Sequence, residues 1–264
     1  MTLPTEGFPL AAAVSPRLQI VESTGSTNAD LVRDVERDPA GHPHLSVLLT
    51  DDQRAGRGRL DRSWTTPAGT ALAVSVLVRV AGLPAHARGW IPLIAGAAMT
   101  RAVTGVLRGQ SHEVRLKWPN DVLLNGGKVC GILAEVVPGD PAAVVIGAGV
   151  NTTMQPVDLP VPTATSFAAV GVTVDVDDLL ARYLRGLDEQ LQKLLIAGGD
   201  AAASGLRAEI EQLCETIGHD VSVGMPDGGV LVGKAVRLDG DGRLVVEVAG
   251  VETVVSAGDV VHVR

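Results

Sequence analysis

Aromatic residues are scarce in this chain, at 2% of its 264 residues. Because 46% of the residues are nevertheless hydrophobic, the core has to be built from Val, Leu, Ile and Ala. A chain of this length buries a sizeable core and accommodates one large domain with a small one. The composition therefore indicates a soluble globular protein.

Cysteine is equally scarce: Cys130 and Cys214 are the two present, with no CxxC pattern and no clustering with histidine. We expect both to be buried, unpaired thiols rather than a disulfide, a zinc site or a nucleophile. The six histidines lack metal-ligand spacing, and the chain contains no HExxH or GxSxG motif. These absences disfavour a hydrolytic metalloenzyme and a serine hydrolase.

Targeting signals are missing as well. Residues 1–15 contain no Lys or Arg ahead of their short apolar stretch, and no later hydrophobic run reaches membrane-spanning length. We expect a cytoplasmic protein with no membrane attachment, in which 1–15 is a flexible segment. The net charge of −8 differs from the broad basic face of nucleic-acid-binding proteins, so no DNA partner is expected.

Hydrophobic periodicity predicts a mixed α and β fold. Strands are expected at 45–50, 70–80, 129–137 and 143–150, with little polar alternation, which indicates a sheet covered by helices. Helices are expected at 27–37, 89–108, 176–197 and 200–216. After Gly218, short Val-rich runs separated by Asp/Gly turns are typical of a small β-barrel, so we place a domain boundary between 217 and 218.

Positive charge is concentrated in one window, 54–62 (RAGRGRLDR), within an otherwise acidic chain. Its glycines let backbone N–H groups approach a ligand, and guanidinium groups pair bidentately with phosphate or carboxylate oxygens. The window therefore predicts an anion-binding loop. Taken alone, it fits a solvated charged loop or an RNA-contacting Arg/Gly segment equally well.

Polar groups also interrupt the hydrophobic pattern at 25–28 (GSTN) and 117–121 (KWPND). GSTN opens a predicted helix, where its hydroxyl and amide groups either cap the helix or bind a polar ligand. In KWPND, a Pro-Asn-Asp turn explains the last three residues but not Lys117 and Trp118.

Small residues accompany a lysine further along the chain. Lys128 precedes 131–135 (GILAE), and 147–151 (GAGVN) ends a predicted strand. Small residues let a flat ligand approach a sheet, although glycine in a strand also marks a bulge. None of the glycine-rich segments completes a Rossmann fingerprint or a P-loop, which disfavours nucleotide sites of those types.

The chain resembles the biotin protein ligases in the order and spacing of its motifs: GSTN, GRGRLDRSW at 56–64, KWPND, Lys128 with GILAE, GAGVN, and SAGDV at 256–260. The resemblance implies an α+β fold. A central mixed β-sheet flanked by helices, as in class II aminoacyl-tRNA synthetases, would occupy 16–217, and a small SH3-like β-barrel 218–264. Because the first motif lies near the N-terminus, it also implies the monofunctional type, which lacks the DNA-binding domain of bifunctional members.

Members of this family activate biotin with ATP and Mg²⁺ to biotinyl-5′-AMP. They then pass biotin to a lysine of the biotin carboxyl carrier domain of an acyl-CoA or acetyl-CoA carboxylase. The resemblance implies the same substrates and partner here, and the sequence indicates no oligomeric state. Two alternatives stay open: a lipoate-type ligase, which shares fold and reaction type, and a non-catalytic ligand-binding or RNA-binding module.

Motif matching assigns residues to three roles. The catalytic candidates are Arg59, Lys117, Asp121 and Lys128, with Asp121 expected to act either as a Mg²⁺ ligand or as a proton acceptor. The biotin-binding candidates are Ser26, Thr27, Asn28, Gln53, Gly56, Arg57, Gly58, Arg59, Lys128, Gly131 and Gly147. The ATP- and adenylate-binding candidates are Arg57, Arg59, Arg62, Trp64, Lys117, Asn120 and Asn151.

Three further expectations concern the surroundings of the site. Trp118 is expected to support its strand from behind rather than to pack its indole along the biotin body. Residues 54–64 are expected to order over the bound adenylate, which water would otherwise destroy. Asp61 stands where family members often have glycine, which implies lower loop flexibility and extra negative charge beside the phosphate.

Overall fold

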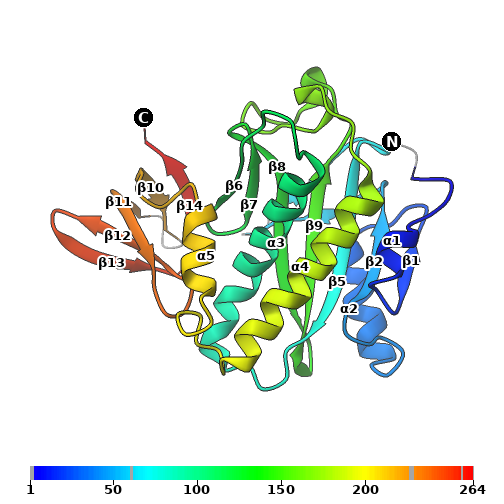
Figure 1. The fold of residues 1–264 in the computed structure, drawn as a ribbon, viewed down its shortest axis with the longest axis horizontal. Coiled ribbons are helices and arrows are strands. Elements are labelled where there is room, and N and C mark those ends of the chain that lie inside the picture. Colours follow the sequence, from blue (N-terminus) through cyan, green and yellow to red (C-terminus); the bar gives the residue numbers. More distant parts are fainter. Residues whose placement is uncertain (1–2, 60–61, 226–228, 257, 264) are drawn as a thin grey trace.

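The computed structural model describes residues 3–59, 62–225, 229–256 and 258–263. A seven-stranded mixed sheet with helices on its faces forms the larger part, and a five-stranded antiparallel sheet follows it (Figure 1). This is the α+β architecture with a small SH3-like C-terminal domain that the sequence predicted. Among the described residues, no helix is both long and apolar enough to cross a membrane.

The central sheet has the strand order β1-β2-β5-β9-β8-β7-β6. Its strands are β1 (Leu18–Ile20), β2 (Ser46–Thr50), β5 (Ala71–Arg79), β6 (Val114–Lys117), β7 (Asp121–Leu124), β8 (Gly127–Val137) and β9 (Asp140–Asn151). β1 runs parallel to β2, and the other neighbouring pairs among these described strands are antiparallel. β3 (Gly56–Arg57) and β4 (Ser63–Trp64) form a separate small hairpin.

The two faces of the central sheet are covered differently. Helices α3 (Trp90–Val106) and α4 (Val176–Ile196) pack on one face, where Val144 and Ile146 of β9 join the large hydrophobic core (Figure 1). On the opposite face, α2 (Thr27–Arg37) packs against a smaller cluster that includes Val145. Because α2 covers only part of this second face, the rest of it is available for a binding site.

The helix predicted at 200–216 is wrong in extent. α5 spans only Leu206–Leu213, and the residues before it form turns. Gly205, at the N-cap of α5, has φ +77°, a left-handed conformation that interrupts a continuous helix. The 3₁₀ helices η1 (Ala85–Gly89), η2 (Pro156–Asp158) and η3 (Ala168–Val170) lie in connecting segments.

The N-terminal segment is also different from the prediction. Residues Pro9–Ala12 form the short helix α1, and Phe8 is buried. The N–H groups of Leu10 and Ala11 each donate to the carboxylate of Asp177 in α4, both at 2.8 Å. The expected flexible segment at 1–15 is therefore wrong for 8–15, since α4 holds this part in place.

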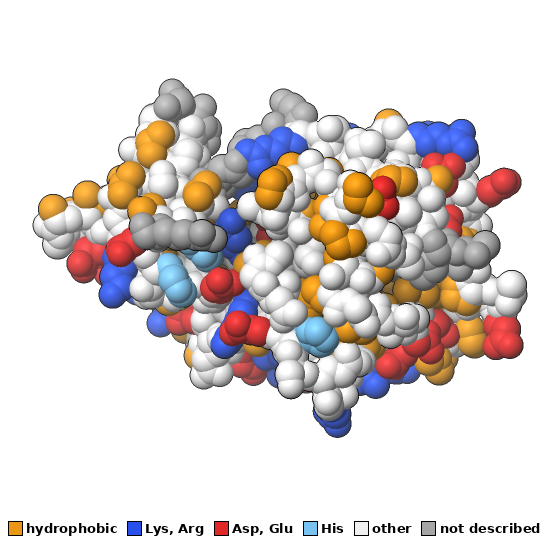
Figure 2. Space-filling view, turned by 90° about the horizontal axis from the view of Figure 1, so that it is seen from above, with side chains coloured by type: hydrophobic (Ala, Val, Ile, Leu, Met, Phe, Trp, Pro, Cys, Tyr) orange, Lys and Arg blue, Asp and Glu red, His pale blue; other side chains and the backbone are white. Residues whose placement is uncertain are grey.

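The C-terminal domain consists of β10 (Asp220–Gly224), β11 (Val230–Leu238), β12 (Leu244–Val248), β13 (Val251–Val255) and β14 (Asp259–His262), in the order β13-β12-β11-β10-β14. Its first strand begins just after the boundary placed between 217 and 218. Part of this small sheet joins the core, and hydrophobic side chains remain on the surface of the molecule (Figure 2). The exposed valines of this domain are Val230, Val232, Val251, Val254, Val261 and Val263. Both cysteines are buried and unpaired, as predicted.

Candidate active site

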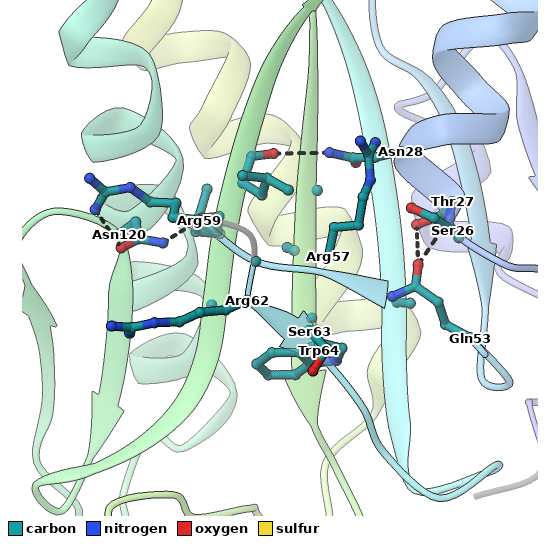
Figure 3. A pocket seen from close by; sticks show the side chains of 18 of the residues that line it. Ser26, Thr27, Asn28, Gln53, Arg57, Arg59, Arg62, Ser63, Trp64 and Asn120 are labelled. Carbon is teal, nitrogen blue, oxygen red and sulfur yellow. Dashed lines mark hydrogen bonds between the residues drawn. The ribbon is translucent and has the colours of Figure 1, made fainter. Parts of the chain in front are cut away.

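A cavity lies on the second face of the central sheet, between the N-terminus of α2 and the β3–β4 hairpin (Figure 3). It brings together residues from all the motifs in the first half of the chain. Of the residues that the sequence singled out, those lining it are Ser26, Thr27, Asn28, Gln53, Arg57, Gly58, Arg59, Arg62, Trp64, Asn120, Asp121, Lys128, Gly131 and Gly147.

One wall of the cavity is uncharged and polar. Ser26 is the N-cap of α2 and accepts a hydrogen bond from the backbone N–H of Ala29 at 3.4 Å. The Oε1 atom of Gln53 accepts from the backbone N–H and the hydroxyl of Thr27, at 2.9 and 3.1 Å (Figure 3). Because Oε1 is occupied in this way, the amide nitrogen of Gln53 is left to donate toward a ligand.

Glycines form the floor of the cavity, where side chains of other elements press against the sheet. A Cβ on Gly147 would lie 2.5 Å from Oδ1 of Asn28, and a Cβ on Gly149 would lie 2.5 Å from the Trp64 indole. A Cβ on Gly131 would lie 3.1 Å from Cε of Lys128. The glycines in these strands are therefore explained by the close approach of other side chains, and not by a β-bulge, which was the alternative explanation.

The opposite end of the cavity is cationic. Nζ of Lys128 lies 2.7 Å from Oδ1 of Asp121 and 5.8 Å from the centroid of the Trp64 ring. Arg59 donates from Nη1 to Oδ1 of Asn120 at 3.3 Å (Figure 3). Burial lowers the pKa of the Arg59 guanidinium, and the charge of Asp121 opposes this shift. An anionic group entering here would meet two cations that are partly removed from water.

The Arg/Gly window folds back on itself as a hairpin. The N–H of Gly58 donates to the carbonyl of Arg62 at 2.6 Å, and β3 pairs with β4. Gly56 lies beneath the hairpin rather than in the cavity lining, and a Cβ there would come 2.4 Å from the carbonyl oxygen of Trp64. Asp61 lies outside the described residues.

Besides Gly56, two predicted site residues do not line the cavity. Lys117 in β6 lies opposite Asp121 of β7 in the strand register. Its positive charge acts on His262 of the C-terminal domain: burial and the charge of Lys117 both lower the pKa of that histidine. Asn151 is 2% exposed, and its Nδ2 donates to the carbonyls of Thr165 (2.9 Å) and Lys128 (3.4 Å). Its structural role is therefore to hold the segment after β9 against β8.

Trp118 does not line the cavity formed by α2 and the β3–β4 hairpin either. Its indole is buried, and Nε1 donates to the carbonyl of Gly242 in the C-terminal domain at 3.1 Å. It supports its strand from behind, as predicted, and it also binds the two domains together.

Sequence reasoning missed Glu135 and Gly149. Oε2 of Glu135 accepts from Nη2 of Arg57 at 2.9 Å and from Nδ2 of Asn28 at 2.8 Å. The signal was present, because Gly131, position 133 and Glu135 alternate along β8 and must share one face of the sheet.

Replacing Gly149 with alanine is expected to weaken binding of a non-hydrolysable analogue of biotinyl-5′-AMP, the ligand that the sequence resemblance implies, about tenfold, because overpacking costs about 1–3 kcal/mol. The new methyl group would displace the Trp64 indole from the floor of the cavity. Titration calorimetry measures the effect. Gly186→Ala is the matched control, since a Cβ at Gly186 in α4 meets only Ala98 at 3.6 Å. Equal affinities of the two variants would contradict the prediction.

Comparisons with known proteins agree with this geometry. Residues 22–151 match the biotin/lipoate A/B protein ligase family, and 216–263 match the biotin protein ligase C terminal domain. The biotin--[acetyl-CoA-carboxylase] ligase of Mycobacterium tuberculosis is 41% identical over 250 residues, which cover 94% of this chain and 90% of that protein. The bifunctional ligase/repressor of Escherichia coli is 32% identical over 179 residues, which cover 66% of this chain and 52% of that protein.

A solved structure shares the fold. The biotin protein ligase from Aquifex aeolicus in complex with biotin and ATP superposes with a TM-score of 0.75 at 23% identity, covering 94% of this chain and 99% of that one. Together with the sequence matches over both domains, this shows that the chain belongs to the biotin protein ligase family.

Proposed function

We propose that the protein activates biotin with ATP to biotinyl-5′-AMP and pyrophosphate, and then transfers biotin to a lysine of a biotin carboxyl carrier domain of a carboxylase. One observation carries the proposal: a single cavity has an uncharged hydrogen-bonding wall at one end and the cations Arg59 and Lys128 at the other. The wall suits the ureido ring of biotin. The cations suit the carboxylate and phosphate that must react.

The first step brings two anions together. A biotin carboxylate oxygen attacks the α-phosphorus of ATP, and the bond to pyrophosphate breaks. Arg59 and Lys128 offset the repulsion between the reactants and stabilise the charge that develops at the phosphate. Arg57 and Arg62 on the hairpin also line the cavity, and the guanidinium of Arg57 lies beside Asn28 at the polar wall. The proposed roles are electrostatic and positional rather than acid–base.

In the second step, the amine of the acceptor lysine attacks the acyl carbon and AMP leaves. The mixed anhydride has to be kept from water between the two steps, and the β3–β4 hairpin lies where it could cover the intermediate. Ordering of residues 54–64 on ligand binding stays a prediction. Protection of this loop from protease by biotin and ATP would support it.

Magnesium would enter with ATP. Among the described residues that line the cavity, Asp121 is the one carboxylate, and no group of three metal-ligating side chains occurs in the described ranges. This donor set suits a Mg²⁺ ion held mainly by substrate phosphates, which commonly uses one or two protein carboxylates. The ion would neutralise phosphate charge. We propose Asp121 either as its protein ligand or as the proton acceptor for the incoming lysine.

A lipoate-type ligase is the competing activity, and the polar wall argues against it. The dithiolane ring of lipoate has no N–H or carbonyl group, so it would leave the amide nitrogen of Gln53 without a ligand acceptor and Oδ1 of Asn28 without a ligand donor. We expect biotin-dependent pyrophosphate release with a kcat/KM about a hundredfold above that for lipoate. A coupled pyrophosphate assay with each acid measures this. Equal rates, or release with lipoate alone, would contradict the assignment to biotin, and release with neither would contradict acid activation.

A further inference from the structure

One carboxylate outside the cavity holds two residues that line it. Oε2 of Glu135 accepts hydrogen bonds from Nη2 of Arg57 (2.9 Å) and Nδ2 of Asn28 (2.8 Å). Glu135 is itself absent from the cavity lining and its side chain is 27% exposed, whereas Asn28 is buried. The carboxylate therefore connects the polar wall to a guanidinium of the hairpin.

The orientation of the Asn28 amide follows from its neighbours. Nδ2 donates to Glu135 and to the backbone carbonyl of Leu133 at 3.2 Å, and both of these groups can only accept. Oδ1 faces the hydroxyl of Ser75, which is fully buried and lies 2.6 Å away. A flipped amide would place its oxygen against a carboxylate and a carbonyl. The amide is therefore held with Oδ1 on the side of β5, above Gly147.

This orientation makes the polar wall complementary to a cyclic urea. Asn28 can offer an acceptor, because both of its N–H groups are occupied. Gln53 can offer a donor, because its oxygen is occupied by Thr27. A cyclic urea presents N–H groups beside a carbonyl oxygen, and so matches one acceptor and one donor on the wall.

We infer that Glu135 is a positioning residue for biotin: it fixes Asn28 so that Oδ1 accepts from a ureido N–H, and it holds Arg57 beside the same ligand. The inference rests on the proposed function. Without Glu135, the Asn28 amide loses the charged acceptor that fixes its orientation, and the Arg57 guanidinium loses the carboxylate that holds it in place.

Replacing Glu135 with alanine is expected to raise both the Kd for biotin alone and the KM for biotin about 10- to 100-fold, because a buried polar partner is lost. The KM for ATP should stay within about twofold of wild type, because Glu135 touches no cation at the Arg59 end of the cavity. Asp140→Ala is the matched control. It removes another carboxylate that holds an arginine on the same sheet, Arg79 at 2.7 Å, away from the cavity, and should leave biotin binding unchanged.

Exchanging the amide and the carboxylate between positions 28 and 135 tests whether Glu135 positions Asn28 or only supports the fold. Asn28→Asp places a second carboxylate against Glu135 and should weaken biotin binding at least about tenfold. Adding Glu135→Gln supplies an N–H donor in place of the repelling oxygen, and should recover most of that loss. Calorimetry with biotin alone measures all variants.

Three outcomes would overturn the inference: unchanged biotin affinity in Glu135→Ala, an Asn28→Asp/Glu135→Gln protein that binds no better than Asn28→Asp, or a wild type that binds no biotin. The proposed function is tested separately. A wild type that binds biotin in a Glu135-dependent way but releases no pyrophosphate would leave the positioning role standing and refute the activation reaction.

Discussion

Replacing Arg59 with alanine is expected to lower the rate of biotin-dependent pyrophosphate release by about a thousandfold, the upper range for removing one preorganised donor from a developing charge. Arg59 is partly desolvated, is oriented by Asn120, and lines both this cavity and a second one that reaches Arg243 of the C-terminal domain. No other arginine borders both spaces among the described lining residues. Its charge can therefore act on the α-phosphate and on the departing pyrophosphate.

The same hairpin region provides the control. Arg54 carries the same charge, but its side chain is 69% exposed and pairs with Asp52 in solvent. Arg54→Ala is expected to change the rate by less than about twofold, since exposed ion pairs contribute little. Rates are compared at saturating ATP and biotin with a coupled pyrophosphate assay, and biotin binding is checked by calorimetry. Equal effects of the two substitutions would show that net charge of the loop, and not the position of Arg59, supports activation.

Much of the fold could be predicted because periodicity reports burial. The long strands β5 and β9 are apolar at nearly every position, which matches a sheet with helices on one face and both α2 and the cavity on the other. The errors have a different cause. Docking of α1 depends on Asp177, more than 160 residues away, and no local pattern reports such a contact.

The residues of the site could be predicted where they belong to motifs, but the direction and the contacts of their side chains could not. Ser26, Arg59 and Lys128 belong to separate motifs, and the structure brings them to one cavity. Motif membership does not say which way a side chain faces. Lys117 and Asn151 do not line the cavity, and their predicted roles toward ATP stay predictions. Glu135 was missed for the complementary reason, because its two partners come from α2 and β3.

Replacing Trp90 with alanine is expected to lower the free energy of unfolding by about 3–5 kcal/mol, as for other large aromatic side chains removed from a core. Trp90 is completely buried at the start of α3, and its Nε1 donates to the carbonyl of Gly240 at 2.8 Å. Gly240 lies in the turn between β11 and β12. The substitution therefore leaves a void and also removes a contact between the two domains.

The turn that Trp90 holds is bound tightly at a second point. Trp118 donates to the carbonyl of Gly242 in the same turn, and a Cβ on Gly89 would come 2.3 Å from the carbonyl oxygen of Asp241. If these contacts couple the domains, the wild type should unfold in one transition in guanidinium chloride. Trp90→Ala should then shift the midpoint strongly and separate loss of the C-terminal sheet from loss of the central sheet, as followed by circular dichroism and hydrogen exchange.

Trp90→Phe separates packing from hydrogen bonding. Phenylalanine keeps most of the buried ring but cannot donate to Gly240. Because Gly240 is exposed and water can replace the indole as donor, the cost should be smaller, about 0.5–1.5 kcal/mol, the net contribution of one hydrogen bond. A single transition in Trp90→Ala with a loss below about 1 kcal/mol would contradict the prediction. Because Arg243 follows the same turn and borders the cavity that Arg59 shares, loosening the turn should also reduce the rate of activation, which connects the stability of this contact to the chemistry.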